Sequence, residues 1–288
     1  MVQCMEVVSS MVEREFVFSQ KNFDFLRSIS NKKTGIVVTD DKFNMFYARL
    51  SRRLRKLGLA DFDSYCDLIR SDPNGEEMIE LVNAVTTNLT SFFRENHHFE
   101  YLSETIVPEM VKNKPAERKV RIWSAGCSTG EEPYSLGITL HEALAPHVGW
   151  NAEILATDID SNVLAKAASG IYSAERVDGL DSRRLQKWFM RGKGANSGMV
   201  RLKPEIMGLI RFGQLNLMED WRLEQPQDVI FCRNVIIYFD KVSKTKLVER
   251  FADNIKEGGY LFIGHSESLF KLTDRFELIG KTIYRKIR

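Results

Sequence analysis

From residue 116 onward the chain alternates short apolar runs with helical patterns, and this alternation restricts the fold more than any other feature of the sequence. The runs with the character of strands cover residues 120–124, 154–157, 209–215, 229–232 and 260–264. Helical patterns lie between them, and the one over residues 241–255 should end at Gly258-Gly259, a C-cap signal. Strands that alternate with helices predict an α/β fold with a parallel sheet and helices on both of its faces.

The end of the chain departs from this alternation. Residues 276–284 read as two strands joined by a tight turn at Gly280, with no room for a crossover helix between them. We therefore predict a terminal antiparallel hairpin, which is unusual for dinucleotide-binding sheets and typical of methyltransferase sheets. A second irregular segment, rich in glycine at Gly192, Gly194 and Gly198, predicts a small β-subdomain over about residues 188–213.

From Asn22 to Glu100 the pattern is helical, and no segment there reads as a strand. A tail of about 18 residues leads into a first helix, and a second helix should stop at Gly58. Asp61 or Asp63 is the candidate cap of a third, and another helical pattern runs from Met78 to Val85. We therefore expect a small all-α domain over residues 1–90, a linker to about residue 115 and an α/β domain over residues 116–288.

Composition excludes several classes of protein. Hydrophobic residues make up 43% and charged residues 28% of the chain, an ordinary globular balance. The net charge of +2 provides no overall basic field for nucleic acid. Four scattered cysteines indicate a reducing compartment, and no run approaches the roughly 20 apolar residues of a membrane span. We expect a cytoplasmic monomer that inserts into no membrane.

The loop over residues 124–134, Ser-Ala-Gly-Cys-Ser-Thr-Gly-Glu-Glu-Pro-Tyr, joins the first strand to a helix. Gly126 and Gly130 permit tight turns and close approach of a ligand to the backbone. The loop lacks the G-x-G-x-x-G pattern, and two acids stand where a pyrophosphate would lie. Acids there favour a cationic ligand group, for which Glu131 is the candidate. Helix-dipole stabilisation is the alternative, which suits Glu132 well and leaves both interpretations open for Glu131.

Two further strand ends carry candidate site residues. Asp158 follows the second strand, where an acid suits the hydroxyls of a ribose. Capping of the next helix is the alternative, and it fits Asp160 better. Arg233 and Asn234 end a buried strand, and Tyr238 follows within about one helical turn. Ordinary capping can explain Arg-Asn at a strand end, but the nearby tyrosine favours a lined pocket.

Residues 83–95 interleave the polar Asn88, Thr90 and Arg94 with apolar side chains. This pattern is typical of a segment that packs on one side and faces a ligand on the other. Arg94 has the fork geometry to hold a carboxylate bidentately. Taken alone, the pattern fits an ordinary helix end at the surface equally well.

These segments resemble those of the CheR-type chemoreceptor methyltransferases. The resemblance covers nearly the whole chain from about residue 23. Five segments occur in the family's order: Asn-Leu-Thr-Ser-Phe-Phe-Arg-Glu, Ser-Thr-Gly-Glu-Glu-Pro-Tyr-Ser, Asp-Ile-Asp, Phe-Cys-Arg-Asn-Val-Ile-Ile-Tyr-Phe-Asp and Gly-His-Ser-Glu. It implies a Rossmann-like sheet that binds S-adenosylmethionine. The cofactor contacts that it implies are Asn88, Thr90, Arg94, Glu131, Asp158, Asn216, Leu217, Arg233 and Asn234. It also implies that Arg94 and Tyr238 lie near the reacting methyl group as catalytic residues.

The resemblance implies methyl transfer from S-adenosylmethionine to glutamate side chains of methyl-accepting chemotaxis receptors, with S-adenosylhomocysteine as the product. A glutamate carboxylate, with a pKa of about 4.3, is ionised at neutral pH and needs no general base. We therefore expect Tyr238→Phe to keep appreciable activity and Arg94→Ala to lose most of it. His97 and His98 are neighbours that point in different directions on a helix, so we expect no metal site.

Lys42, Arg49, Arg53 and Lys56 are spaced to share one helix face. Taken alone, this pattern predicts a solvated face. The resemblance implies instead that the helical domain recognises the receptor and that Arg49, Arg53 and Lys56 dock on acidic receptor helices. The predicted β-subdomain resembles one that, in some family members, pairs with a peptide at the receptor's C-terminus. A plain hairpin loop explains its glycines equally well.

Three other functions fit parts of the sequence. A nicotinamide-dependent oxidoreductase on a similar sheet is disfavoured by the missing G-x-G-x-x-G and by the acids after Gly130. A non-catalytic binding module is disfavoured by the complete set of cofactor residues that the resemblance implies. A methyltransferase for another protein or for a small molecule is opposed only weakly, by the basic helix face.

Overall fold

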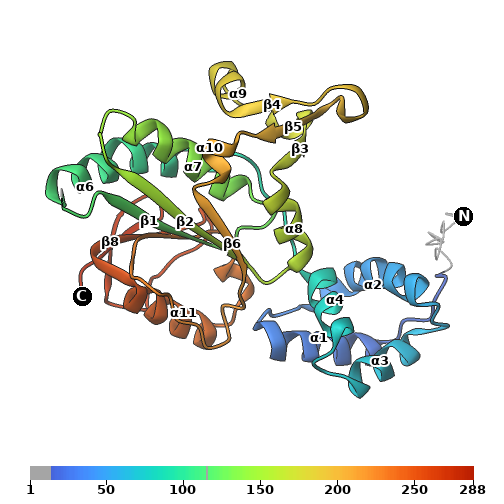
Figure 1. Cartoon of the computed structure of the whole chain (residues 1–288). Coiled ribbons are helices and arrows are strands. Elements are labelled where there is room, and N and C mark those ends of the chain that lie inside the picture. The colour runs from blue at the N-terminus through green and yellow to red at the C-terminus, as the bar shows by residue number, and fades with distance from the viewer. Residues whose placement is uncertain (1–13, 115) are drawn as a thin grey trace, which may run out of the picture. The chain divides into compact units, whose positions relative to one another are not determined.

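The computed structural model describes residues 14–114 and 116–288. By its internal contacts the chain divides into two compact units. The smaller unit contains the residues up to Ile29 and Val38–Val85, and the larger unit contains Ser30–Val37 and Thr86–Arg288. Figure 1 labels the elements of both. No helix of the described residues is long and apolar enough to cross a membrane.

The smaller unit is all-α, as the sequence predicts. Its elements are α1 (Gln20–Thr34, of which the part from Ser30 belongs to the larger unit), η1 (Asp40–Lys42), α2 (Phe43–Leu57), α3 (Phe62–Ser71) and α4 (Glu76–Val85). The prediction that α2 stops at Gly58 is confirmed, since this residue has a left-handed φ of 67°. Asp61, and not Asp63, caps α3 by accepting the N–H of Ser64 at 2.8 Å.

The larger unit is built on a seven-stranded sheet with the order β6-β2-β1-β7-β8-β10-β9. Its strands are β1 (Lys119–Ala125), β2 (Asn151–Asp158), β6 (Ile210–Gln214), β7 (Gln227–Cys232), β8 (Ile255–Ile263), β9 (Phe276–Gly280) and β10 (Ile283–Lys286). The first five in the order are parallel, whereas β10 is antiparallel to both β8 and β9. The predicted Rossmann-like sheet with a terminal antiparallel hairpin is confirmed.

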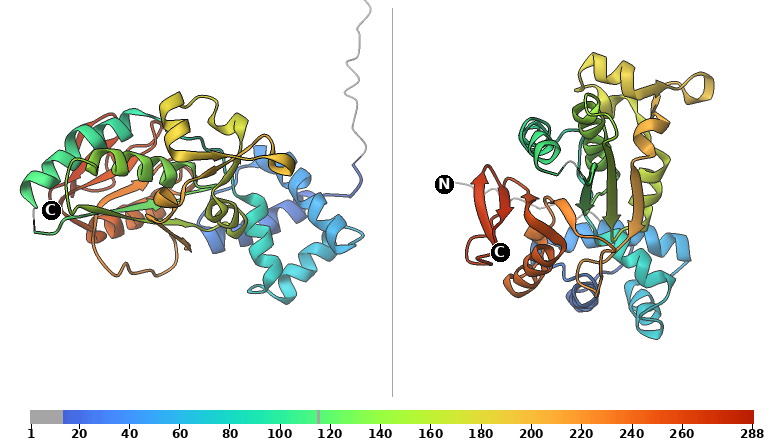
Figure 2. Two further views of the ribbon diagram at one scale, coloured as in Figure 1. Left: turned by 45° about the horizontal axis from the view of Figure 1, so that its top comes forward. Right: turned by 60° about the vertical axis from the view of Figure 1, so that its left-hand side comes forward.

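Successive residues of the central strands point to opposite faces of this sheet, and each face packs on its own helices. Val229 and Phe231 of β7 share a core with α5 (His97–Tyr101), η2 (Leu102–Ile106), α6 (Val107–Asn113) and α7 (Glu131–Leu144). The alternate residues Ile230 and Cys232 pack with α11 (Lys241–Asn254). Figures 1 and 2 show α6 and α7 on one side of the sheet and α11 on the other.

The segment expected to be a linker up to residue 115 is largely helical. Residues 97–113 form α5, the π-helical turn η2 and α6 in succession. Phe99, Leu102 and Ile106 of this segment are buried in the same core as Val120 of β1. These apolar residues recur every three or four positions, the spacing of a helix that packs on one side.

Two predicted turn glycines have other roles. α11 ends at Asn254 and β8 begins with the next residue, so Gly258 does not cap the helix. With a φ of 70° it lies in β8, where the register with β7 shifts. A Cβ on Gly259 would lie 2.7 Å from the carbonyl oxygen of Asp228, which explains a glycine there. The terminal hairpin turns at Lys281-Thr282, both with positive φ, rather than at Gly280.

A separate antiparallel sheet has the strand order β3-β5-β4. Its strands are β3 (Ile171–Ser173), β4 (Phe189–Arg191) and β5 (Met199–Leu202). The predicted β-subdomain over residues 188–213 therefore begins too late and runs into β6, which pairs with β2. With only three residues, β3 is too short to show an alternating pattern in the sequence.

The remaining elements are α8 (Ser161–Ser169), η3 (Ala174–Val177), α9 (Ser182–Trp188), η4 (Gly194–Asn196), α10 (Pro204–Met207) and η5 (Ile236–Tyr238).

Candidate functional site

The carboxyl ends of β2, β1 and β7 are neighbours in the large sheet, and the polar residues that follow them meet at one edge. After β1 the chain makes a tight loop into α7. Gly126 and Gly130 in this loop have φ of 90° and 97°, a region that residues with a side chain rarely adopt. A Cβ on Gly126 would lie 2.5 Å from Val235 Cγ2, which follows β7. The glycines therefore let the loop pass close to the neighbouring strand end.

Asp158, at the end of β2, is 8% exposed. Its Oδ2 accepts the N–H of Ser128 at 2.8 Å, and its Oδ1 accepts the N–H of Asp160 at 3.0 Å. Burial raises the pKa of Asp158, and these backbone hydrogen bonds oppose the rise. Each carboxylate oxygen keeps a further lone pair for a ligand hydroxyl. Asp160 caps α8 by accepting the N–H groups of Asn162 and Val163, the role that its position in the sequence favours.

Glu131 is the first residue of α7 and its side chain is fully buried. Oε2 of Glu131 accepts the hydroxyl of Thr129 at 2.6 Å. Oε1 of Glu131 forms an ion pair with the guanidinium of Arg176, which comes from η3 next to β3. Arg176 also donates to the carbonyl oxygen of Thr90 at 2.9 Å. Glu131 is thus a paired carboxylate at the helix start, and sequence reasoning gave no signal for Arg176.

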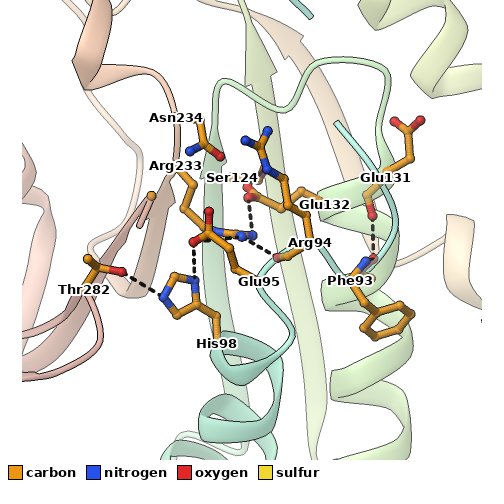
Figure 3. Close-up of polar contacts among 12 residues, drawn as sticks. Phe93, Arg94, Glu95, His98, Ser124, Glu131, Glu132, Arg233, Asn234 and Thr282 are labelled. Atoms are coloured by element: carbon orange, nitrogen blue, oxygen red, sulfur yellow. Dashed lines mark hydrogen bonds and ion pairs between the residues drawn. The ribbon is translucent and has the colours of Figure 1, made fainter. Parts of the chain in front are cut away.

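Glu132 takes part in a different cluster, which Figure 3 shows. Its Oε1 accepts the hydroxyl of Ser124 at 2.7 Å, and its Oε2 lies 3.1 Å from Nη1 of Arg233. Arg233, with its side chain only 2% exposed, also pairs with Glu95 at 3.3 Å. Burial raises the pKa of Glu132, and the charge of Arg233 opposes that rise. Glu132 therefore holds Arg233 in addition to lying at the positive end of the helix dipole.

The segment around Arg94 is irregular and firmly held. Phe93 and Glu95, on either side of Arg94, have φ of 52° and 57°. Such backbone strain in residues with side chains persists only where the surroundings impose it. The Phe93 N–H donates to Ser135 Oγ at 2.9 Å, and Arg233 donates to the carbonyl oxygen of Arg94. The side chain of Arg94 donates to the carbonyl oxygen of Leu89 at 2.9 Å.

Glu95 is the centre of the same cluster, between Arg233 and two histidines (Figure 3 labels His98). Burial opposes ionisation of Glu95, but a hydrogen bond from His265 and the charge of Arg233 outweigh it and lower the pKa to about 2. His265 Nδ1 lies 2.9 Å from Oε1 of Glu95. His98 is fully buried, and burial together with Arg233 lowers its pKa to about 3. His98 is therefore neutral, with Nε2 lying 3.1 Å from the carbonyl oxygen of Lys281.

Asn234, after β7, has a φ of 59° and lies against Gly264, where a Cβ would come within 2.3 Å of its side-chain nitrogen. Buried Glu267 accepts the N–H groups of Asn234 at 2.9 Å and of Ile237 at 3.1 Å. Tyr238 is half-buried at the end of η5. The Gly-His-Ser-Glu segment thus shapes the backbone that carries Asn234 and Tyr238.

The other predicted cofactor residues lie in the same unit, but several are engaged internally. The Asn88 amide donates to Asp160 Oδ2 at 2.8 Å. Thr90 contributes its carbonyl oxygen to Arg176. The Asn216 amide donates to the carbonyl oxygen of Lys33 at 2.6 Å, and Leu217 is buried. The structure therefore gathers Glu131, Asp158 and the Arg94 segment around the strand ends and gives Asn88 and Asn216 structural hydrogen bonds.

The predicted docking residues belong to the smaller unit. Arg53 is mostly buried and forms a bidentate pair with Glu77, with Glu80 also within 3.6 Å. Arg49 donates to the carbonyl oxygen of Ala84 at 3.1 Å. Lys56 is exposed, and no hydrogen bond or ion pair joins its side chain to another described residue. The helix face is therefore partly neutralised by α4, which the spacing of basic residues within α2 could not indicate.

The residues at the strand ends fit the chemistry of S-adenosylmethionine. That molecule carries an ammonium group, a sulfonium and a ribose diol. A buried carboxylate with an unused lone pair stands after the loop that follows β1 (Glu131), and another ends β2 (Asp158). Among the described residues no group of three or more His, Cys, Asp and Glu could hold a metal ion.

Comparison with known proteins covers nearly the whole chain. The all-alpha domain of CheR methyltransferases matches residues 21–86, and the SAM binding domain of CheR methyltransferases matches residues 88–285. The chain is 42% identical over 280 residues to the chemotaxis protein methyltransferase of Salmonella typhimurium, a match that covers 96% of this chain and 94% of that protein. It is also 42% identical over 276 residues to the Escherichia coli protein of that description, with 95% and 93% covered.

Proposed function

The chain belongs to the CheR methyltransferase family, and from this premise we propose that it transfers the methyl group of S-adenosylmethionine to glutamate side chains of methyl-accepting chemotaxis receptors. The products are glutamyl methyl esters and S-adenosylhomocysteine, and the esters serve sensory adaptation. The observation that carries the proposal is the pair of buried carboxylates, Glu131 and Asp158, at adjacent strand ends of a methyltransferase sheet.

In this proposal the strand-end residues divide the cofactor between them. Glu131 holds the ammonium group, and Asp158 accepts hydrogen bonds from the ribose hydroxyls. The remaining residues of the proposed cofactor site are Asn88, Thr90, Arg94, Asn216, Leu217, Arg233 and Asn234. Arg233 contributes through the backbone that it fixes, because its guanidinium is occupied by Glu132, Glu95 and the carbonyl oxygen of Arg94.

S-adenosylmethionine supplies a methyl group on a cationic sulfur, which becomes the neutral thioether of S-adenosylhomocysteine. The receptor carboxylate is already an anion at neutral pH, with a pKa of about 4.3, so the protein need not remove a proton. What the protein contributes is alignment and exclusion of water around the carboxylate oxygen. Arg94, on its strained and doubly anchored segment, and Tyr238 are the residues we propose for this positioning.

Substitution of these two residues tests that role. Tyr238→Phe should keep at least about a tenth of the wild-type rate, because the ring and its packing remain. Arg94→Ala should lose more than about 100-fold, because the cation is removed from the site. Both rates are measured with the same receptor membranes. Equal and complete inactivation of the two variants would contradict a positioning role for Tyr238.

We propose that the receptor docks on α2. Lys56 is the exposed cation of this surface, and Arg49 and Arg53 belong to the same helix face. Arg53→Glu is a poor test because it would place a second acid against Glu77. Lys56→Glu should lower the rate of receptor methylation several-fold and leave the affinity for S-adenosylhomocysteine unchanged. Lys21→Glu, an exposed lysine of α1, is the matched control. Equal losses in both variants would remove the docking role from Lys56.

We further propose a cytoplasmic monomer that can bind a C-terminal receptor peptide through the edge of the β3-β5-β4 sheet.

The decisive experiment for the function as a whole uses the full chain, methyl-labelled S-adenosylmethionine and receptor-rich membranes. Label should appear in the receptor and be released as methanol by mild base, the property of an ester. No transfer to receptors from a chain that binds S-adenosylhomocysteine would point to another methyl acceptor.

A further inference from the structure

The ion pair between Glu131 and Arg176 leaves hydrogen-bonding capacity unused on both partners. Glu131 Oε2 receives only the Thr129 hydroxyl among the described residues. Arg176 uses its Nε and Nη2 toward Glu131 and its Nη2 toward the carbonyl oxygen of Thr90. Its Nη1, with two N–H groups, donates to no other described residue. A free acceptor and a free double donor therefore remain on this partly exposed ion pair.

The two partners also differ in exposure in a way that suits an incoming ligand. The Glu131 side chain is fully buried, whereas that of Arg176 is 35% exposed. The carboxylate is fixed at the start of α7, and the guanidinium reaches it from η3, directly after β3. An arginine whose only task was to neutralise a buried carboxylate would turn its full fork to that group. Here both bonds go to one carboxylate oxygen, Oε1.

The amino-acid end of S-adenosylmethionine is a zwitterion, with an ammonium and a carboxylate on the same carbon. A single charged residue attracts one of these groups and repels the other. An adjacent anion and cation satisfy both, because each ligand charge then faces its opposite. Guanidinium groups bind carboxylates especially well, through paired N–H donors in one plane.

We propose that Arg176 is a binding residue for the α-carboxylate of the cofactor, and that Glu131 and Arg176 together recognise the zwitterion. This inference rests on the proposed function, since it names the part of the same cofactor that a residue outside the matched sequence motifs would hold. It places the carboxylate at Nη1 of Arg176 and the ammonium at Oε2 of Glu131. The adenosine part is held elsewhere and should not sense Arg176.

The experiment compares three ligands by isothermal titration of the full chain. S-adenosylhomocysteine has both charges, its decarboxylated analogue keeps only the ammonium, and 5′-methylthioadenosine has neither. The wild type should prefer S-adenosylhomocysteine over the decarboxylated analogue by about 10- to 100-fold, the range expected for charged hydrogen bonds. In Arg176→Gln this preference should shrink to less than about threefold, while binding of 5′-methylthioadenosine stays within about twofold.

Two variants serve as references. Arg183→Gln changes an exposed arginine of α9 and should keep the wild-type preference. Arg94→Ala tests the other cation near the site, and a preference that disappears there but persists in Arg176→Gln would assign the carboxylate to Arg94 and overturn the proposal. Tighter binding of both charged ligands by Arg176→Gln would also overturn it, because Arg176 would then be a competitor of the ammonium.

A structural role for Arg176 has a different signature. If Arg176 only tied Thr90 to Glu131, its loss would weaken all three ligands by similar factors, and the proposal would be wrong. Failure of the proposed function looks different again: either the wild-type chain binds none of the three ligands, or it binds them and transfers no methyl group to receptors.

Discussion

Glu131 and Glu132 are consecutive residues at the start of α7, yet they belong to two ion-pair clusters of opposite character. The Glu131–Arg176 cluster is partly exposed and keeps unused hydrogen-bonding groups. The Glu132–Arg233 cluster is buried and includes Glu95 as a second acid for the same guanidinium. Two acids one residue apart face different sides of a helix, so the helix start separates their tasks.

The difference between the clusters shows how the chain builds a site. Buried charges that face an opposite charge hold a backbone in one conformation, here the strained turn that presents Arg94. A partly exposed charge with unused hydrogen-bonding groups, such as that of Arg176, remains available to a ligand. We therefore infer that the site backbone is supported by Glu132, Arg233 and Glu95, and that the cofactor is bound by Glu131 and Arg176.

The largest expected effect follows from removal of the cation of the buried cluster. Arg233→Met should lower the free energy of unfolding by about 3–5 kcal/mol, because buried Glu132 would lose its cation and Glu95 would keep only His265. Methyl transfer by the remaining folded protein should fall more than about 100-fold, since the Arg94 carbonyl oxygen loses its donor. Urea unfolding and the receptor methylation assay measure the two effects.

Arg176→Met is the matched comparison for Arg233→Met. Its loss of stability should be clearly smaller, because the Arg176 side chain is 35% exposed and Thr129 still donates to Glu131. If both variants lose the same stability, the distinction between a supporting cluster and a binding cluster is wrong.

An intermediate effect separates the two acids themselves. Glu131→Gln should weaken binding of S-adenosylhomocysteine by about 10- to 100-fold, because the ammonium loses its anion. Glu132→Gln should change that affinity by less than about threefold and lower the free energy of unfolding by about 1–3 kcal/mol instead. Calorimetric titration gives the affinity of each variant for S-adenosylhomocysteine, and urea unfolding gives the free energy of unfolding of each. Equal losses of affinity would mean that both acids contact the ligand.

The sequence predicts the architecture well because the architecture depends on repeated patterns. Strand and helix periodicity recur many times between residues 116 and 288, and the lack of a crossover after Phe276 indicates the antiparallel hairpin. Single-residue signals are less reliable. Gly258 resembles a C-cap yet lies in β8, because the close approach of Asp228 to Gly259 decides the backbone there.

The site is predictable only where its residues follow strand ends. Asp158, Glu131 and Asn234 do so, and their places at the sheet edge follow from the fold. Arg176 is in a short 3-10 helix 45 residues after its partner Glu131, and no pattern in the sequence connects the two. Pairing of Arg53 with Glu77 likewise joins two helices, so the spacing within α2 gave the helix face but not its partners.

A smaller effect, on pH dependence, tests how closed the buried cluster is. The pKa of His98 is lowered to about 3 by burial and by Arg233, whereas an exposed histidine titrates near 6.5. As the pH falls below 6.5 the unfolded chain takes up this proton and the folded chain does not, so stability falls by up to about 1.4 kcal/mol per pH unit. The lowered pKa of Glu95, about 2 against an ordinary 4.5, adds a loss in the same direction only below about pH 4.5.

The range from pH 6.5 to 5 therefore isolates His98. His98→Gln should reduce the slope of unfolding free energy against pH in that range by about one proton, measured by urea unfolding of wild type and variant in the same buffers. Other titrating groups contribute equally to both proteins and cancel in the difference. An unchanged slope would mean that water reaches His98 in the folded protein, and the buried cluster would then be no more closed than the pair at Glu131.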